Sequence, residues 1–197
     1  MPPPITVFML NRHIEDLFTE KSYQAIDYHW VASENISPYA AMAVVAAEDQ
    51  QFFQHHGFDL KSIGSSIRVY SNGGRLRGAS TISQQVAKNL FLTPSKSFLR
   101  KALEAWFTLV LEMVWDKQRI LEVYLNIIEF GDHLFGIEAA SQHYFGISAK
   151  KLNRSQAAIL AATLPNPLRL KIKKPSSYLI RRQQWILRQM RNLGELP

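Results

Sequence analysis

The sequence predicts a mainly α-helical protein with one domain. Most stretches place apolar residues at intervals of three and four, and no stretch alternates apolar and polar residues convincingly enough for a strand. The run at residues 39–47 is uncharged and mostly small and apolar, without glycine or proline, which is typical of a buried helix. With 197 residues and no internal repeat, the chain is long enough for one sizeable core or at most two small ones.

Nine helices are expected, and several have recognisable start and stop signals. They lie within residues 11–21, 38–48, 58–70, 79–92, 98–115, 116–130, 134–144, 155–164 and 176–193. Ser37-Pro38 is a start signal for the second helix, which ends near Glu48. The fourth is expected to begin at Ser80 or Thr81, with a glutamine three residues further on to close a capping box.

The later helices differ in their expected surroundings. Between Ala105 and Leu111 the fifth helix is apolar all round, so it is predicted to be the central buried helix. The sixth helix carries its apolar residues on one face, and the last one is strongly basic. Residues 71–78 are rich in glycine and basic residues and predict a mobile loop.

Composition limits the classes of function. The 23 lysines and arginines against 16 acidic residues give a net charge of +7, which favours anionic partners such as phosphorylated substrates, nucleic acid or an anionic membrane face. Cysteine is absent from the sequence, which excludes disulfides and thiolate metal sites. No uninterrupted apolar stretch approaches the ~20 residues that span a bilayer.

The stretch that ends at Glu48 indicates chemistry. Glu48 and Asp49 directly follow the apolar run, at the C-terminal end of the predicted helix. Apolar surroundings and the negative end of the helix dipole both disfavour an ionised carboxylate, so both raise its pKa toward the range that suits a general base near neutral pH. The alternative is a solvated glutamate where a core helix meets a loop.

Several motifs, taken in order, resemble the peptidoglycan glycosyltransferases with a lysozyme-like fold. The motifs are Glu48-Asp49-x-x-Phe52-x-x-His55-x-Gly57, Gly78-x-Ser80-Thr81-Ile82-x-Gln84-Gln85, Arg100-Lys101-x-x-Glu104, Ile120-Leu121-Glu122-x-Tyr124-Leu125-Asn126, and Gly136-Ile137-Glu138-Ala139-Ala140 with Tyr144-Phe145-Gly146. The resemblance covers roughly residues 31–170. It implies a helical glycosyltransferase domain at 31–197, with a mobile flap over an extended cleft, preceded by a juxtamembrane segment at 1–30.

The resemblance also implies the reaction. The family joins a lipid-pyrophosphate-linked glycan to the 4-hydroxyl of a lipid-linked disaccharide, lipid II, and inverts the donor linkage to β-1,4. By resemblance Glu48 is the base and Glu104 the second carboxylate of the site. Glu104 has three open roles: to hold a divalent metal ion (Mg or Mn), to orient a lysine, or to polarise the pyrophosphate. A plain helix-surface ion pair is the alternative. No organic cofactor is expected.

Cationic and neutral polar residues are expected to bind the substrate. The predicted set for the pyrophosphate and sugars is Lys88, Lys96, Asn89, Arg100, Lys101, Ser80, Thr81, Gln84 and Gln85. A solvated basic face is the alternative for the cations, and plain helix capping is the alternative for one of the two hydroxyl residues. Residues of the cleft and of the structural motif are Asp49, Phe52, His55, Gly57, Gly78, Tyr124 and Asn126.

Location and partners follow from the same resemblance. The domain is expected at the periplasmic face of the inner membrane, with lipid II, the nascent glycan strand, the membrane surface and proteins of cell wall synthesis and division as partners, and no nucleic acid. Family members are tethered by an N-terminal helix, so an apolar segment of ~20 residues is expected ahead of Met1 in the native product; a soluble cytoplasmic protein is the alternative. The transpeptidase domain of bifunctional relatives is not expected here.

Two other functions fit part of the sequence. Paired carboxylates in a helical fold also suit a lysozyme-like hydrolase, but such an enzyme has no pyrophosphate for the basic cluster to neutralise. A non-catalytic basic module that binds nucleic acid or anionic lipid would explain the +7 charge, yet it gives no reason for Glu48 after an apolar run.

Overall fold

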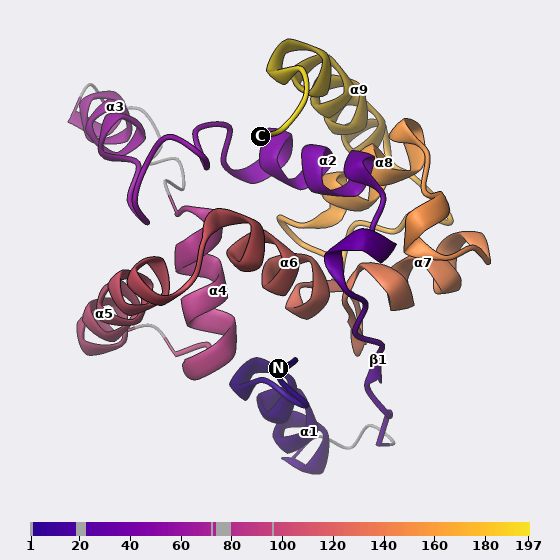
Figure 1. The fold of residues 1–197 in the computed structure, drawn as a ribbon. Coiled ribbons are helices and arrows are strands. Elements are labelled where there is room, and N and C mark those ends of the chain that lie inside the picture. The colour runs from indigo at the N-terminus through magenta and orange to yellow at the C-terminus, as the bar shows by residue number, and fades with distance from the viewer. Residues whose placement is uncertain (1, 19–22, 72, 74–79, 96) are drawn as a thin grey trace.

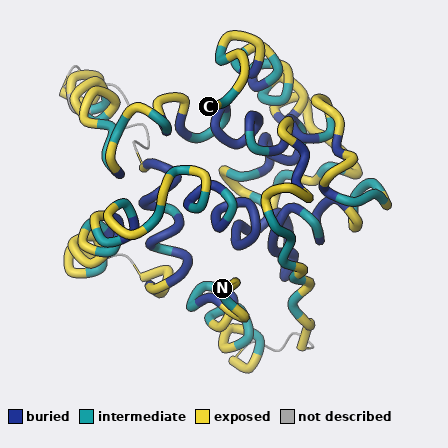
Figure 2. The backbone as a smooth tube through the Cα atoms, viewed as in Figure 1, coloured by how far each residue is buried: buried dark blue, intermediate teal, exposed yellow. Residues whose placement is uncertain are grey.

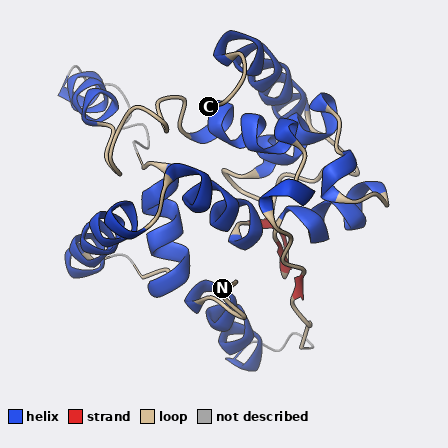
Figure 3. Cartoon of the chain, viewed as in Figure 1, coloured by secondary structure: helices blue, strands red, loops and turns tan. Residues whose placement is uncertain are grey.

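The computed structural model describes residues 2–18, 23–71, 73, 80–95 and 97–197, and this part of the chain is mainly helical (Figures 1 and 3). The helices are α1 Val7–Phe18, α2 Pro38–Glu48, α3 Leu60–Ser71, α4 Ile82–Phe91, α5 Phe98–Val114, α6 Lys117–Ile127, α7 Ile137–Phe145, α8 Arg154–Thr163 and α9 Ser177–Leu193. Short 3-10 helices lie at Ser33–Asn35 and Ala149–Lys151, and the strands are β1 Asp27–Tyr28, β2 Glu129–Gly131 and β3 Leu134–Phe135. The predicted helical fold class is confirmed.

Side-chain caps explain where the helices start. Ser37 caps α2 by accepting a hydrogen bond from the amide of Tyr39, and Pro38 occupies the first turn, where its missing N–H costs nothing. The predicted capping box of α4 is present: the Thr81 hydroxyl accepts from the Gln84 amide at 3.2 Å, and the Gln84 side chain accepts from the Thr81 amide at 3.0 Å. Both predicted start signals are confirmed.

A small sheet was not predicted. Its strand order is β1-β3-β2, with β1 parallel and β2 antiparallel to β3, and Asp27 pairs with Leu134 (Figure 3). The expectation of no strand is wrong because these strands have only two or three residues, too few for an alternating pattern to appear.

The core lies around α2 and α6, which are dark along most of their length in Figure 2. α2 packs against α8 and α9, and α6 packs against α4. The buried side chains of these two central helices are Ala40, Met42, Ala43, Val44, Val45, Ala46, Ile120, Leu121, Val123, Tyr124, Leu125, Asn126 and Ile127. α2 is buried on almost all sides. Its last residue, Glu48, is therefore held at a fixed position.

The prediction that the fifth helix is the central buried one is wrong. α5 buries only Glu104, Thr108 and Leu111, whereas Trp106 is 60% and Met113 75% exposed. When a helix is apolar on all sides, exposure of any side to water is unfavourable. The pattern does not indicate whether protein or lipid covers the side that faces away from the core.

The N-terminal helix starts earlier than predicted. α1 begins at Val7 because Thr6 caps it, its hydroxyl accepting from the amide of Met9 at 3.1 Å. Arg12 joins α1 to β2 through two hydrogen bonds to Glu129, of 3.0 and 2.9 Å. In the described part of the chain, no helix has both the length and the apolar character needed to cross a bilayer.

Candidate active site

Glu48 is the last residue of α2, and side chains from two other helices converge on it. Gln85 of α4 donates from Nε2 to Glu48 Oε2 at 3.1 Å, and Arg182 of α9 lies with Nη2 3.2 Å from Glu48 Oε1. The Glu48 side chain keeps 16% of its surface exposed. The carboxylate is therefore held firmly and still reaches solvent.

The surroundings of Glu48 favour its protonated form. Burial raises the pKa of its carboxyl above the usual range, and the charge of Asp49 acts in the same direction. The hydrogen bond from Gln85 and the charges of Arg182 and Lys88 lower the pKa in part. A carboxylate balanced in this way suits proton transfer at neutral pH, in the direction predicted from the sequence.

Tyr124 forms a hydrogen bond with Gln85 on the side of the amide away from Glu48. Its hydroxyl donates to Gln85 Oε1 at 3.3 Å, while the other end of the same amide donates to Glu48. Burial raises the pKa of Tyr124 well above its usual value, so the phenol keeps its proton. The chain from Tyr124 through Gln85 therefore fixes which end of the amide faces Glu48.

Asp49, next to the candidate base, has a structural environment. Its carboxylate accepts from the amide of Ile82 at 3.0 Å, at the start of α4, and His55 Nε2 lies 3.0 and 3.1 Å from its two oxygens. This arrangement ties the loop after α2 to the beginning of α4.

Gly57 and Phe52 complete that loop. Gly57 has φ +83°, and a Cβ atom there would lie 2.8 Å from Thr108 Cγ2 of α5, so both the conformation and the space require glycine. The Thr81 hydroxyl donates to the Gly57 carbonyl at 2.7 Å. Phe52 is fully buried, with Lys117 Nζ 4.5 Å from its ring centroid. These contacts fix the orientation of α2, α4 and α5 around Glu48.

Glu104 lies on α5 and is 3% exposed. Arg100 Nη1 donates to its Oε2 at 2.6 Å, and Lys101 Nζ pairs with its Oε1. Burial lowers the pKa of Lys88 on α4, and the charge of Glu104 raises it in part. The Lys88 ammonium therefore interacts electrostatically with the Glu104 carboxylate. Glu104 thus forms ion pairs with Arg100 and Lys101, and its charge also acts on Lys88, so a ligand with negative charge would find an excess of positive charge there.

The role of Glu104 as a ligand of a divalent ion stays a prediction. Cations already occupy both carboxylate oxygens, and among the described residues no group of three or more His, Cys, Asp or Glu side chains is arranged to hold a metal. The ion pair with Arg100 and Lys101, which was the alternative from the sequence, is present but buried.

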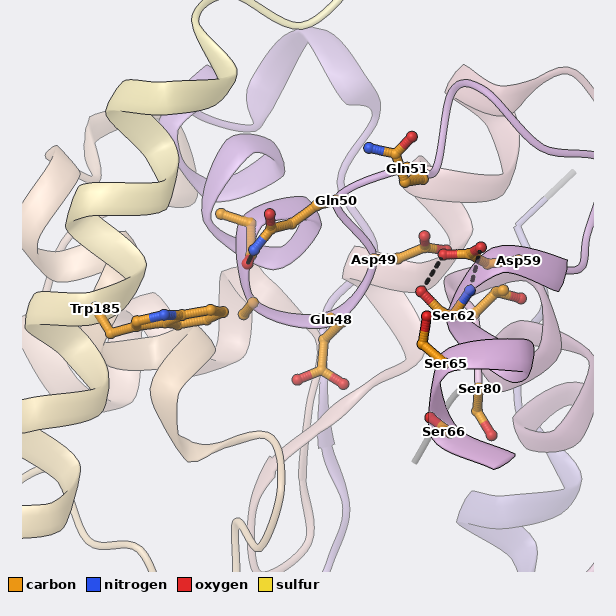
Figure 4. Close-up of a pocket in the computed structure, with 13 residues that line it drawn as sticks. Glu48, Asp49, Gln50, Gln51, Asp59, Ser62, Ser65, Ser66, Ser80 and Trp185 are labelled. Carbon is orange, nitrogen blue, oxygen red and sulfur yellow. Dashed lines mark hydrogen bonds between the residues drawn. The ribbon is translucent and has the colours of Figure 1, made fainter. Parts of the chain in front are cut away.

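A pocket of about 480 Å³ opens beside Glu48 (Figure 4). Trp185 of α9 lies on one side of Glu48, and serines of α3 lie on the other side, as the close-up shows. The pocket is lined by Ala46, Ala47, Glu48, Asp49, Gln50, Gln51, Asp59, Ser62, Ser65, Ser66, Ser80, Thr81 and Trp185. Amides, hydroxyls and one aromatic face suit a sugar.

The remaining predicted residues are placed as follows. Ser80 is exposed at the pocket, whereas Thr81 and Gln84 use their side chains to cap α4, and Asn89 is buried on the same helix. Asn126 exchanges two hydrogen bonds of 2.9 Å with the backbone of the segment before α2 and donates to the Glu122 carbonyl at 2.8 Å. Their roles in substrate binding stay predictions, and Gly78 and Lys96 lie outside the described residues.

Sequence reasoning missed Arg182, Trp185 and the serines of α3. Arg182 is 134 residues from Glu48 in sequence, so no local spacing connects the two. The only available signal was the pair of arginines inside the first turns of the last, basic helix. The Nε atoms of Arg182 and Arg100 are buried and have no hydrogen-bond partner among the described residues.

A helical fold with a buried carboxylate at a pocket suited to a sugar is consistent with an enzyme that acts on glycans, and sequence comparison gives its family. A family model described as "Transglycosylase" matches residues 15–191. The chain therefore belongs to the transglycosylase family, whose lysozyme-like fold agrees with the predicted fold class.

Individual relatives agree with this assignment. The biosynthetic peptidoglycan transglycosylase of Shewanella oneidensis is 54% identical to the chain, over 98% of the chain and 82% of the relative. The protein of the same name from Aeromonas hydrophila is 50% identical, over 98% of the chain and 81% of the relative. The protein of that name from Escherichia coli O127:H6 is 53% identical over 100% of the chain and 81% of its own length. The predicted resemblance to this family is confirmed.

Proposed function

We propose that this chain is a peptidoglycan glycosyltransferase that polymerises lipid II into β-1,4 glycan strands for the cell wall. The observation that carries the proposal is Glu48, a carboxylate with a raised pKa that lines a sugar-sized pocket. The charge of Lys88 acts on the same carboxylate. The family and the names of the relatives support the same reaction.

The site residues suit one displacement step. Glu48 takes the proton of the acceptor 4-hydroxyl, the oxygen forms a bond to the donor anomeric carbon on the face opposite the leaving group, and the bond to the lipid pyrophosphate breaks with its electron pair. The configuration therefore inverts, and one general base is sufficient. Gln85 and Arg182 hold Glu48 in place for the transfer.

We assign the leaving group to the cationic cluster. Lys88, Arg100 and Lys101 surround Glu104, and the Nε of Arg100 has no partner among the described residues. Negative charge develops on the pyrophosphate as the bond breaks, so preorganised cations stabilise the transition state more than the bound substrate. Glu104 keeps the arginine and lysine side chains pointed at the site. No step requires a metal ion, although Mg or Mn could bind with the pyrophosphate of the substrate.

The inner membrane is the proposed place of action, with the domain at its periplasmic face. Large apolar side chains follow one side of α5 at helical spacing: Leu99, Leu103, Trp106 and Met113 are all exposed. α1, which packs on α4 as α5 does, exposes Leu17 and Phe18. These exposed apolar side chains favour contact with the membrane that carries the lipid substrate.

One assay separates this proposal from its competitors. The protein is incubated with purified lipid II, and the products are separated by size. Polymers larger than the disaccharide support a glycosyltransferase. Cleavage of preformed glycan strands without polymerisation would indicate a hydrolase, and binding of anionic lipid without any product would indicate a non-catalytic module. The cationic cluster around Glu104 favours the first outcome.

A further inference from the structure

Trp185 is the one aromatic side chain that lines the described pocket, and nothing in the proposed reaction uses it. In Figure 4 its ring reaches from α9 toward the pocket on the side of Glu48 away from α3. An aromatic face beside hydroxyl and amide groups is a common surface on which a sugar ring packs its C–H face.

Two arginines flank Trp185 on the same helix. Arg181 lies four residues before it and Arg188 three residues after it, and residues at these spacings are neighbours on a helix surface. Both arginines are exposed, and neither forms an ion pair within the part of the chain that the structure describes. The buried residues of α9 are Leu179, Ile186 and Met190, and Trp185 is partly buried and packs against the same core, whereas the two arginines are exposed.

The C-terminal part of the chain, which includes α9, is strongly basic. Eleven of the 23 lysines and arginines, but only one of the 16 acidic residues, follow residue 147. The first 147 residues therefore carry more acidic than basic side chains, and the positive field of the protein comes from the segment that contains α8 and α9. Four of these cations, Arg181, Arg182, Arg188 and Arg191, lie on α9, the helix that carries Trp185.

We propose that Trp185, Arg181 and Arg188 form a subsite that binds the glycan by its peptide: the sugar packs on Trp185 while carboxylates of the attached peptide pair with the two arginines. The inference rests on the proposed function, and it adds recognition of the peptide to that of the sugar and pyrophosphate. Arginine suits this task because its planar fork binds a carboxylate through two parallel hydrogen bonds.

The position of the subsite favours peptide carboxylates over a second pyrophosphate. The cations assigned to the pyrophosphate lie on α4 and α5, whereas α9 meets Glu48 from a different side of the molecule (Figure 1). Arg181 and Arg188 are seven residues apart, so they are separated by about 10 Å along the helix axis, which is comparable to the length of one disaccharide. Two carboxylates of one substrate molecule can reach both.

The test compares two substrates in the same assay. Lipid II with free peptide carboxylates and lipid II with those carboxylates amidated are supplied to the wild type and to the double variant Arg181→Gln/Arg188→Gln. We expect the double variant to lose roughly fivefold in kcat/KM on the free-carboxylate substrate, mainly through KM, because exposed charge contacts are individually weak. On the amidated substrate the two proteins should differ by less than about twofold.

Matched controls isolate the subsite. Arg191→Gln removes the same charge from α9 without neighbouring Trp185, and it should leave both substrates unaffected. Trp185→Ala should weaken both substrates alike, because the sugar is unchanged. Equal losses of the arginine variant on both substrates, or a loss in Arg191→Gln as large as in the double variant, would overturn the proposal. If the wild type polymerises neither substrate, the proposed function itself fails, which is a different result.

Discussion

At the scale of single residues, the ionisation of Glu48 depends on opposing neighbours. Burial and Asp49 favour the protonated acid, whereas Gln85, Arg182 and Lys88 favour the carboxylate. A base that is fully stabilised as a carboxylate would accept a proton poorly, and one that is fully destabilised would already carry a proton at neutral pH. The net result is a pKa of Glu48 raised above its usual value, with part of the rise from burial offset by Gln85, Arg182 and Lys88.

Replacement of the base gives the most direct prediction. Glu48→Gln keeps the size and the hydrogen-bonding shape of the side chain but cannot take a proton, so polymerisation should fall by ~10²–10⁴-fold or more. Initial rates with lipid II measure this loss, and far-UV circular dichroism checks the fold. A variant with near-wild-type turnover and an unchanged spectrum would exclude Glu48 as the base.

Arg182 should control the pH dependence of the reaction. Its charge lowers the pKa of Glu48, so in Arg182→Gln the pKa should rise further. Because only the ionised carboxylate is active as a base, the acidic limb of the profile of kcat/KM against pH should move to higher pH, and activity should fall more in mildly acidic than in alkaline buffer.

The conservative variant provides the control for this shift. Arg182→Lys keeps the positive charge and should leave the acidic limb closer to that of the wild type. An acidic limb that stays in place in Arg182→Gln would mean that Arg182 positions Glu48 without acting on its ionisation.

At the scale of elements, local signals in the sequence predicted the helix starts well. Ser37 and Thr81 act as caps where expected, because a cap depends only on residues within one turn. The burial of α5 and the approach of Arg182 to Glu48 depend on how distant helices pack, and no spacing along the chain contains that information. The same holds for the sheet, whose strands are defined only by their partners.

The start of α4 should matter for stability. Thr81→Ala removes the cap of α4 and the hydrogen bond to the Gly57 carbonyl, so the free energy of unfolding should fall by about 1 kcal/mol, within a range of roughly 0.5–2. Urea denaturation measures this change. Thr81→Ser keeps the hydroxyl and should recover most of the loss, and equal stability of the alanine variant and the wild type would contradict the assignment.

α3 is the element expected to move. None of its described side chains is buried (Figure 2), although Ser62, Ser65 and Ser66 line the pocket (Figure 4). The predicted flap at 71–78 continues from it, but residues 72 and 74–79 lie outside the described part. A helix with so few core contacts opens at low cost and can close over a ligand.

Hydrogen exchange tests this motion. With a saturating phosphoglycolipid inhibitor, amide protection across residues 60–78 should increase, because the segment gains contacts with the ligand. Protection that rises near Glu48 but does not change across 60–78 would mean that this segment is only a connector.

At the scale of the whole molecule, two surfaces of different chemistry lie on different helices around the same site. The exposed apolar side chains lie on α5 and α1, next to α4 and the cationic cluster, whereas Arg181 and Arg188, which form no ion pair with any described residue, lie with Trp185 on α9. Figure 1 shows α9 apart from α4 and α5. This arrangement fits a substrate that has a lipid at one end and a charged, water-soluble glycan at the other. Because the apolar and basic surfaces lie on different helices, the net charge of +7 does not indicate which surface contacts the membrane.

Membrane binding should therefore depend on apolar side chains of α5 more than on charge. Trp106 and Met113 are 60% and 75% exposed, so replacing both with lysine removes apolar surface without disturbing the core. We expect binding to anionic vesicles to fall by roughly tenfold or more, since burying each large apolar side chain contributes on the order of 1.5–3 kcal/mol when it is complete. Lys150→Gln/Lys151→Gln, on the short helix before α8, should change vesicle binding little. Co-sedimentation measures binding, and polymerisation in detergent shows that the site is intact. Stronger binding by the lysine variant than by the wild type would show that charge attraction, and not the apolar side of α5, holds the protein at the membrane.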